Sequence, residues 1–100
     1  MKTIKEAMQI LRKTKSLKNI DKDFRNKREV ALEAVKIDGV NIKYLINSLQ
    51  HDYEILAEAL FSNEETIYYI DTNYILRDEN FISYLLNNTF QGEKGVYNEI

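Results

Sequence analysis

The chain of 100 residues contains no cysteine, no proline, no tryptophan, three glycines and one histidine. The lack of cysteine excludes a disulfide scaffold, and a zinc site would need carboxylates for nearly all of its ligands, which is unusual. The lack of proline removes the residue that most often interrupts helices. No run of about 18 apolar residues could span a bilayer, and no apolar signal-peptide core follows the basic N-terminus. We therefore expect one domain, residues 1–100, in the cytoplasm, without metal, cofactor or membrane.

The strongest pattern in the sequence is an internal repeat with a spacing of about 25 residues. Residues 26–35, 51–60 and 77–86 align, and their apolar residues fall at i, i+1, i+4 and i+5, which is one stripe of a helix. The stripes are Val30, Ala31, Ala34 and Val35, then Ile55, Leu56, Ala59 and Leu60, then Phe81, Ile82, Leu85 and Leu86. A second motif, at 41–45 and 66–70, follows the first two stripes. The sequence thus predicts an all-α stack of helical hairpins of roughly three and a half units, counting residues 1–25 as a degenerate copy.

Capping residues predict where these helices begin and end. Thr3 with Glu6, and Ser62 with Glu65, have the spacing of capping boxes. Asp52 and Asp78 are placed as N-caps, and Asp38-Gly39 can supply a left-handed residue at a helix end. Residues 89–100 contain two glycines and little apolar periodicity, so we expect a frayed tail there.

The repeat resembles a bacterial helical-repeat family catalogued as a domain of unknown function, with units of the form D-x-E-V-x-x-x-A-V-x-x-x-G followed by a short L-x-Y-A helix. Residues 26–45 carry the pattern best, through Glu29-Val30, Ala34-Val35, Gly39 and Tyr44-Leu45. The resemblance covers residues 24–88, and the third copy departs from it, with Asn80 at the position of the acid. It implies a stack of α-hairpins and no particular activity.

No catalytic motif is present in the sequence. There is no glycine-rich phosphate loop, no calcium-binding loop and no nucleophile elbow. The acidic pairs Glu64-Glu65 and Asp78-Glu79 lie in first turns, where the helix dipole explains negative charge. We therefore do not expect an enzyme.

Charge divides the chain into a basic and an acidic half. Residues 1–50 hold twelve Lys and Arg against six Asp and Glu, a net charge of +6, whereas residues 51–100 hold two against ten, a net charge of −8. Three explanations stay open: solubility alone, phosphate binding by the basic half, or steering to a partner protein. The candidate nucleic-acid-binding residues are Lys13, Lys15, Lys18, Lys22, Arg25 and Arg28.

The repeat register sorts the tyrosines into two groups. Tyr44, Tyr69 and Tyr74 align with positions beside the core and are expected to pack, whereas Tyr53, Tyr68 and Tyr84 align with polar residues and are expected to be exposed. Exposed tyrosines among acidic residues are typical of protein-binding surfaces. The predicted partner-binding residues are Tyr53, Tyr68, Tyr84, Asp52, Glu58, Glu64 and Glu65.

These patterns lead to one functional hypothesis and one alternative. The hypothesis is a non-enzymatic protein-binding module that blocks or holds a larger host protein, such as a phage-type or mobile-element inhibitor, or an immunity-like protein, acting on a nucleic-acid-handling enzyme. The alternative is a nucleic-acid-binding protein that uses its basic N-terminal region.

Overall fold

The computed structural model describes residues 1–92, with side chains up to Asn88. Within this range the chain is helical and forms no strand, which confirms the predicted all-α class. In chain order the elements are α1 (Ile4–Thr14), α2 (Lys22–Arg25), α3 (Arg28–Ile37), the 3₁₀-helix η1 (Gly39–Tyr44), α4 (Asn47–Gln50), α5 (Tyr53–Ser62), the 3₁₀-helix η2 (Glu64–Tyr69), α6 (Thr72–Ile75) and α7 (Glu79–Gly92).

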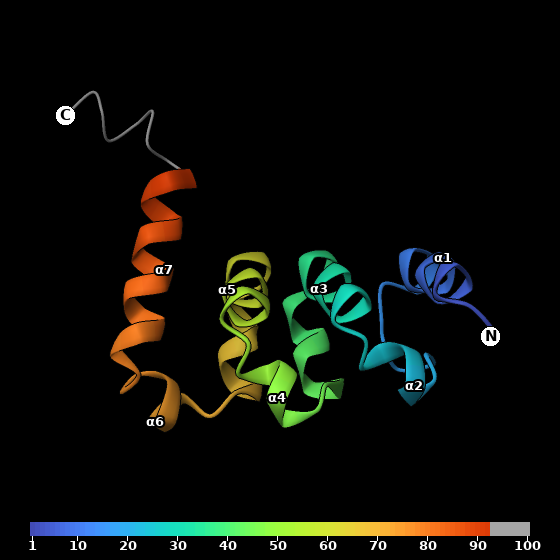
Figure 1. Ribbon diagram of the computed structural model, residues 1–100, viewed down its shortest axis with the longest axis horizontal. Coiled ribbons are helices and arrows are strands. Elements are labelled where there is room, and N and C mark those ends of the chain that lie inside the picture. Colours follow the sequence, from blue (N-terminus) through green and yellow to red (C-terminus); the bar gives the residue numbers. More distant parts are fainter. Residues whose placement is uncertain (93–100) are drawn as a thin grey trace. The chain divides into compact units, whose positions relative to one another are not determined.

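The chain divides into two compact units. The first comprises residues 1–70, and the second begins at Asp71, between η2 and α6. In the first unit α3 packs between α1 and α5, and η1 and η2 lie against each other and against the helices beside them. Figure 1 shows α1, α3 and α5 following one another in chain order.

The bounds of the elements recur at the interval of the sequence repeat. The order α3, η1, α4 is followed by α5, η2, α6, and each element has the same length as its counterpart and begins at the aligned residue. α2 and α4 are related in the same way. The short helices expected at 41–45 and 66–70 correspond to the 3₁₀-helices η1 and η2. A 3₁₀-helix has fewer residues per turn than an α-helix and is common in short connections.

The core of the first unit contains the predicted stripes of α3 and α5 except Leu60, which is half-buried. Val30, Ala31, Ala34 and Val35 are fully buried in α3, and Ile55, Leu56 and Ala59 are buried in α5. α1 adds Ala7 and Leu11, and the segment before α2 adds Leu17 and Ile20. Burial of each large side chain contributes about 1.5–3 kcal/mol, so the contact of α3 with its two neighbours is the main source of stability.

The second unit contains α6 and α7. Ile75 and Phe81 are buried, whereas Leu86, the last residue of the third predicted stripe, is 51% exposed. α7 extends past Asn88 to Gly92, so residues 89–92 of the expected frayed tail lie within the helix. No proline or glycine stops the helix between these two positions. The remainder of the expected tail, residues 93–100, lies outside the described residues.

The helix caps confirm three of the sequence predictions and correct two. Thr3 Oγ1 accepts a hydrogen bond from Glu6 N, and Asp52 and Asp78 cap their helices through Oδ1. Ser62 does not cap η2; its hydroxyl donates to the carbonyl oxygens of Val35 and Ala59, and Asn63 Oδ1 accepts from Glu65 N instead.

Gly39 does not adopt a left-handed conformation, because no glycine in the described part of the chain has a positive φ. Its role is steric: a Cβ atom at this position would overlap the carbonyl oxygen of Ala59 and the hydroxyl of Thr66. The glycine therefore permits α5 and η2 to approach the start of η1 closely.

The left-handed residue in the described chain is Lys15, at φ 61° and ψ 21°, where its amide donates to Leu11 O and ends α1. A side chain in this conformation costs about 1–2 kcal/mol relative to glycine. We expect Lys15→Gly to raise the free energy of unfolding by about 1 kcal/mol, measured by urea denaturation. Lys13→Gly, within the helical last turn, is the control and should lower it by a similar amount.

Candidate functional site

The candidate site lies on η2 and consists of Glu64, Glu65, Ile67 and Tyr68, which line one surface pocket. We call these four residues the η2 patch. Residues three apart on a 3₁₀-helix lie one above the other, so Glu64 lies over Ile67 and Glu65 over Tyr68. The fold of this segment is fixed by the Asn63 cap and by the buried Thr66, whose hydroxyl donates to Ala59 O at 3.0 Å.

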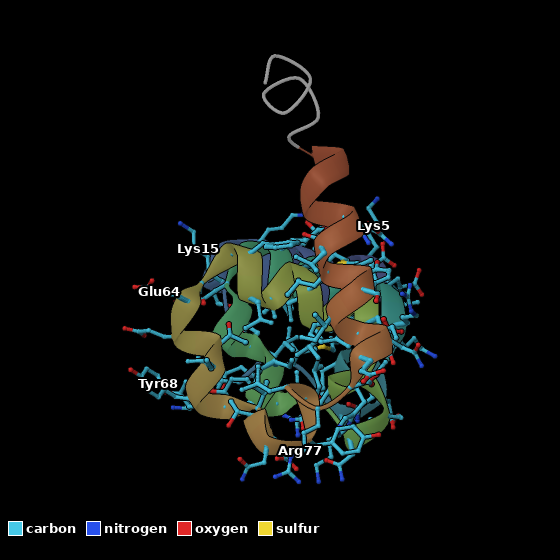
Figure 2. The ribbon with its side chains drawn as sticks, turned by 90° about the vertical axis from the view of Figure 1, so that its left-hand side faces the viewer. Lys5, Lys15, Glu64, Tyr68 and Arg77 are labelled. Carbon is cyan, nitrogen blue, oxygen red and sulfur yellow. The ribbon has the colours of Figure 1, made fainter. Side chains whose placement is uncertain are left out.

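The η2 patch is open to solvent. Tyr68 is 81% exposed and Ile67 is 45% exposed, and both glutamates are exposed. Figure 2 shows Glu64 and Tyr68 pointing away from the body of the first unit on the same side. A large ring held this far out of the core contributes little to packing, which makes it available for contact with another molecule.

Comparison with η1 explains why this patch is exposed. Ile67 is the repeat equivalent of Ile42, which is fully buried, and Glu64 is the equivalent of Gly39, which is buried against Ala59. η1 is covered by the elements that follow it, whereas in the described chain no further 3₁₀-helix follows η2. The row of 3₁₀-helices therefore ends with an open edge at the η2 patch.

Aromatic rings beside the patch already hold a cation. Lys43 Nζ lies 5.0 Å from the centroid of the Tyr69 ring and 5.3 Å from that of Tyr44. These are distances at which an ammonium group is attracted to the face of a ring. The edge formed by η1 and η2 thus combines aromatic and charged side chains.

A second polar cluster joins α3 to the start of α5. Arg28 Nε and Nη2 donate to the two carboxylate oxygens of Asp52 at 2.8 and 3.1 Å, and Nη2 also donates to Glu54 Oε1 at 2.6 Å. The hydrogen bonds that Arg28 donates lower the pKa of Asp52, and the same bonds, accepted by Asp52 and Glu54, raise the pKa of Arg28. Asp52 therefore has a structural role as a cap and an ion-pair partner.

This ion pair predicts a pH dependence of stability. Because the pKa of Asp52 is lower in the folded chain, its contribution is present above the ordinary aspartate value of about 3.9 and is lost as the pH falls through the folded pKa. Asp52→Asn retains a good N-cap but removes the charge. We expect this variant to be less stable than wild type at pH 7 and the difference to shrink below about pH 4, followed by thermal unfolding. A difference that is constant with pH would contradict this assignment.

The other predicted partner-binding residues do not line the pocket of the η2 patch. Tyr53 and Glu58, on α5, are half-buried, as is Tyr84, which belongs to the second unit. The expectation that Tyr53 and Tyr84 are exposed is therefore wrong. The expectation assumed that the residues aligned with these tyrosines are exposed. Glu33 and Glu58, which align with Tyr84, are themselves half-buried. Arg28, which aligns with Tyr53, extends toward α5.

The predicted packing of Tyr69 and Tyr74 is also wrong, since these residues are 43% and 58% exposed. The residues aligned with these tyrosines are covered by the copy of the repeat that follows them. The repeat register therefore cannot predict burial where the row of 3₁₀-helices ends. The sequence analysis also missed Ile67 as a site residue. One signal in the sequence could have indicated that η2 is exposed: the position of Gly39 is occupied by Glu64 in the next copy of the repeat.

The basic residues proposed for nucleic-acid binding fall into two groups. Lys13, Lys15, Lys18 and Lys22 are exposed between the end of α1 and the start of α2. Arg25 is half-buried, with its Nε atom buried and without a hydrogen-bond partner, and Arg28 is engaged by Asp52 and Glu54. Four of the six side chains thus remain accessible to phosphates.

Residues 1–92 contain neither a metal-binding cluster nor a membrane-spanning helix. No group of three or more histidine, cysteine or acidic side chains is arranged to hold a metal ion. No helix combines the length and apolar character needed to cross a membrane.

The described residues define an all-helical protein with a solvent-exposed patch of aromatic and acidic side chains. Residues 27–77 match the model of the family described as Domain of unknown function (DUF4116), and the chain belongs to this family. The match spans α3 to α6 and therefore includes both 3₁₀-helices. The D-x-E-V unit stays a prediction. No curated protein and no solved structure matches the chain.

Proposed function

We propose that the chain is a non-enzymatic protein-binding module whose contact surface is centred on Tyr68. The observation that carries this proposal is the exposure of the Tyr68 ring, at 81%, in a pocket shared with Ile67 and two glutamates. An aromatic anchor with charged residues around it is the usual composition of the energetically important part of a protein interface.

The regular recurrence of the helices supports this proposal. We interpret α3 with η1, and α5 with η2, as stacked helical hairpins, the finer form of the fold. Repeat proteins of this kind present extended surfaces, and residues at the end of a row remain available for partners. In the narrower form of the proposal the chain blocks a larger nucleic-acid-handling protein in a host cell, in the manner of a phage-type inhibitor or an immunity-like protein.

The test is affinity capture from a lysate of the encoding organism with the tagged full chain and with Tyr68→Ala. We expect the wild-type chain to retain a stoichiometric protein that survives nuclease treatment. Loss of a central aromatic anchor costs about 2 kcal/mol or more, so affinity for the captured protein should fall at least about 30-fold. The helical circular dichroism should not change, since Tyr68 lies outside the core.

Tyr74→Ala is the matched control, because Tyr74 is also more than half exposed but does not line the pocket of the η2 patch. It should retain the captured protein. Equal binding by wild type and Tyr68→Ala would contradict the assignment of the surface, and identification of the captured protein tests the narrower proposal.

A second candidate function is nucleic-acid binding by the four exposed lysines Lys13, Lys15, Lys18 and Lys22. This candidate predicts that affinity for DNA or RNA falls steeply with salt, because each neutralised phosphate releases a counterion. Captured nucleic acid that nuclease removes, with no protein left behind, would favour this candidate over the first.

A further inference from the structure

The two carboxylates of the η2 patch differ from the acidic groups that link the helices of the first unit. Asp52 and Glu54 are paired with Arg28, and Glu33 lies 3.5 Å from Arg12. Among residues 1–92 neither Glu64 nor Glu65 forms an ion pair, and both are exposed. Two unpaired negative charges therefore flank the Tyr68 ring without a cation of their own.

We propose that the η2 patch accepts a lysine or arginine side chain from the partner protein. This inference rests on the proposed function and gives the chemistry of the partner: a basic segment at its contact surface. The pocket is lined by one aromatic side chain, two acidic side chains and one aliphatic side chain. These are the groups that receive the charged end and the alkyl stem of a long basic residue.

The chain itself contains the model for this contact. In η1 and η2 the ammonium group of Lys43 lies over the rings of Tyr44 and Tyr69, one repeat interval apart. Tyr68 is the repeat equivalent of Lys43, at the open edge of the same row. A basic residue from a partner that bound the Tyr68 ring would make the same kind of contact that Lys43 makes with Tyr44 and Tyr69.

Charge favours a basic partner over an acidic one. The half of the chain that carries the patch, residues 51–100, has two basic residues against ten acidic residues. The first turn of η2 contributes Glu64 and Glu65. Glu65 lies over Tyr68 on the 3₁₀-helix, so one bound group can contact both the carboxylate and the ring. A cation bound there would be attracted to the Glu65 carboxylate and to the Tyr68 ring at the same time. An anion would be repelled by the carboxylates of Glu64 and Glu65.

The test is a titration of the ¹⁵N-labelled full chain with three unstructured peptides of equal length, carrying three lysines, three arginines or three acetyl-lysines. We expect the lysine and arginine peptides to move the amide resonances of residues 64–69 at millimolar concentration. The acetyl-lysine peptide, which has lost the charge, should not move them. Tyr68→Ala should weaken binding of the lysine peptide about tenfold.

Charge-matched variants separate specific from general electrostatic attraction. Glu64→Gln with Glu65→Gln should reduce the affinity and flatten its salt dependence, whereas Asp21→Asn with Glu29→Gln, which removes two exposed carboxylates elsewhere, should leave the affinity unchanged. Shifts spread over the acidic surface, an equal response to acetyl-lysine, or no shift at η2 would each overturn the proposal.

Two further readouts distinguish this proposal from others. Shifts of residues 64–69 on concentrating the free protein would identify a second copy of the chain as the occupant and overturn the assignment to a partner protein. If the peptides fail while Tyr68-dependent protein capture succeeds, the proposed function stands and the chemistry assigned to the partner is wrong. If the peptides bind at η2 while protein capture does not depend on Tyr68, the proposed function fails and the cation site remains.

Discussion

Gly39→Ala is expected to lower the free energy of unfolding by about 2–4 kcal/mol, one of the two largest effects of a single substitution that we predict. The added methyl group would lie 2.7 Å from the carbonyl carbon of Ala59 and still closer to two oxygen atoms. One of these is the hydroxyl of Thr66, whose hydrogen bond to Ala59 O holds η2 on α5. Backbone atoms cannot rotate away as a flexible side chain would, so α5 and η2 must shift together.

The measurement is urea denaturation followed by far-ultraviolet circular dichroism, with the midpoint and the slope compared between variants. Glu64→Ala is the matched control, because Glu64 occupies the same position in the next copy of the repeat and is exposed. It should change stability by no more than about 0.5 kcal/mol. If Gly39→Ala were as neutral as this control, the close contact of η1 with α5 would be disproved.

The contrast between Gly39 and Glu64 also shows what the sequence could predict and what it could not. Helical periodicity correctly placed Val30, Ala31, Ala34 and Val35 in the core, because a stripe on one face of a helix has few ways to be buried. The spacing of the repeat likewise predicted which segments are equivalent. These are properties of local sequence, and tertiary context did not override them.

The reason for a glycine could not be deduced from local sequence. A glycine after an aspartate at the end of a helix fits a left-handed cap equally well, and only the position of Ala59, on α5, reveals the steric role. Ser62 was misassigned for the same reason, since its hydroxyl bonds to Val35 O in the neighbouring helix.

The candidate site was predicted in part. Tyr68 was selected from the register of the repeat, and Glu64 and Glu65 were selected as acidic residues near the exposed tyrosines; all three line one pocket. Asp52 was selected by charge alone, and its engagement by Arg28 depends on how α3 and α5 pack. Exposure also depends on whether another element covers a position, which the register alone does not specify; Ile42 and Ile67 are equivalent in sequence but not in burial.

Asn41→Ala is expected to have an effect comparable to that of Gly39→Ala, for a different physical reason. Asn41 is 4% exposed and uses both ends of its amide. Its Oδ1 accepts from Leu17 N at 3.0 Å, and its Nδ2 donates to Ala34 O at 3.0 Å and to Lys15 O at 3.2 Å. The side chain thus joins η1 to α3 and to the segment between α1 and α2.

Alanine at this position would leave the buried Leu17 amide without a partner, and Ala34 O would keep only the hydrogen bond that it accepts from Asp38 N. We expect these losses to cost about 2–4 kcal/mol in total. Thr66, the repeat equivalent of Asn41, donates to Ala59 O, which is the equivalent of Ala34 O. Asn41→Thr should therefore restore the bond to Ala34 O and recover part of the stability, without restoring the contact with Leu17. Asn47→Ala, an exposed position at the start of α4, is the control and should be nearly neutral.

Hydrogen exchange distinguishes loss of this particular link from general destabilisation. If Asn41 fastens the N-terminal segment, the Leu17 amide should lose protection in Asn41→Ala by more than the amides of α5, because residues 15–20 can detach while α3 and α5 remain packed. Equal loss of protection in both regions would mean that the segment and the helices unfold together, and that Asn41 stabilises the first unit as a whole. Unchanged protection of Leu17 would show that its amide does not depend on Asn41.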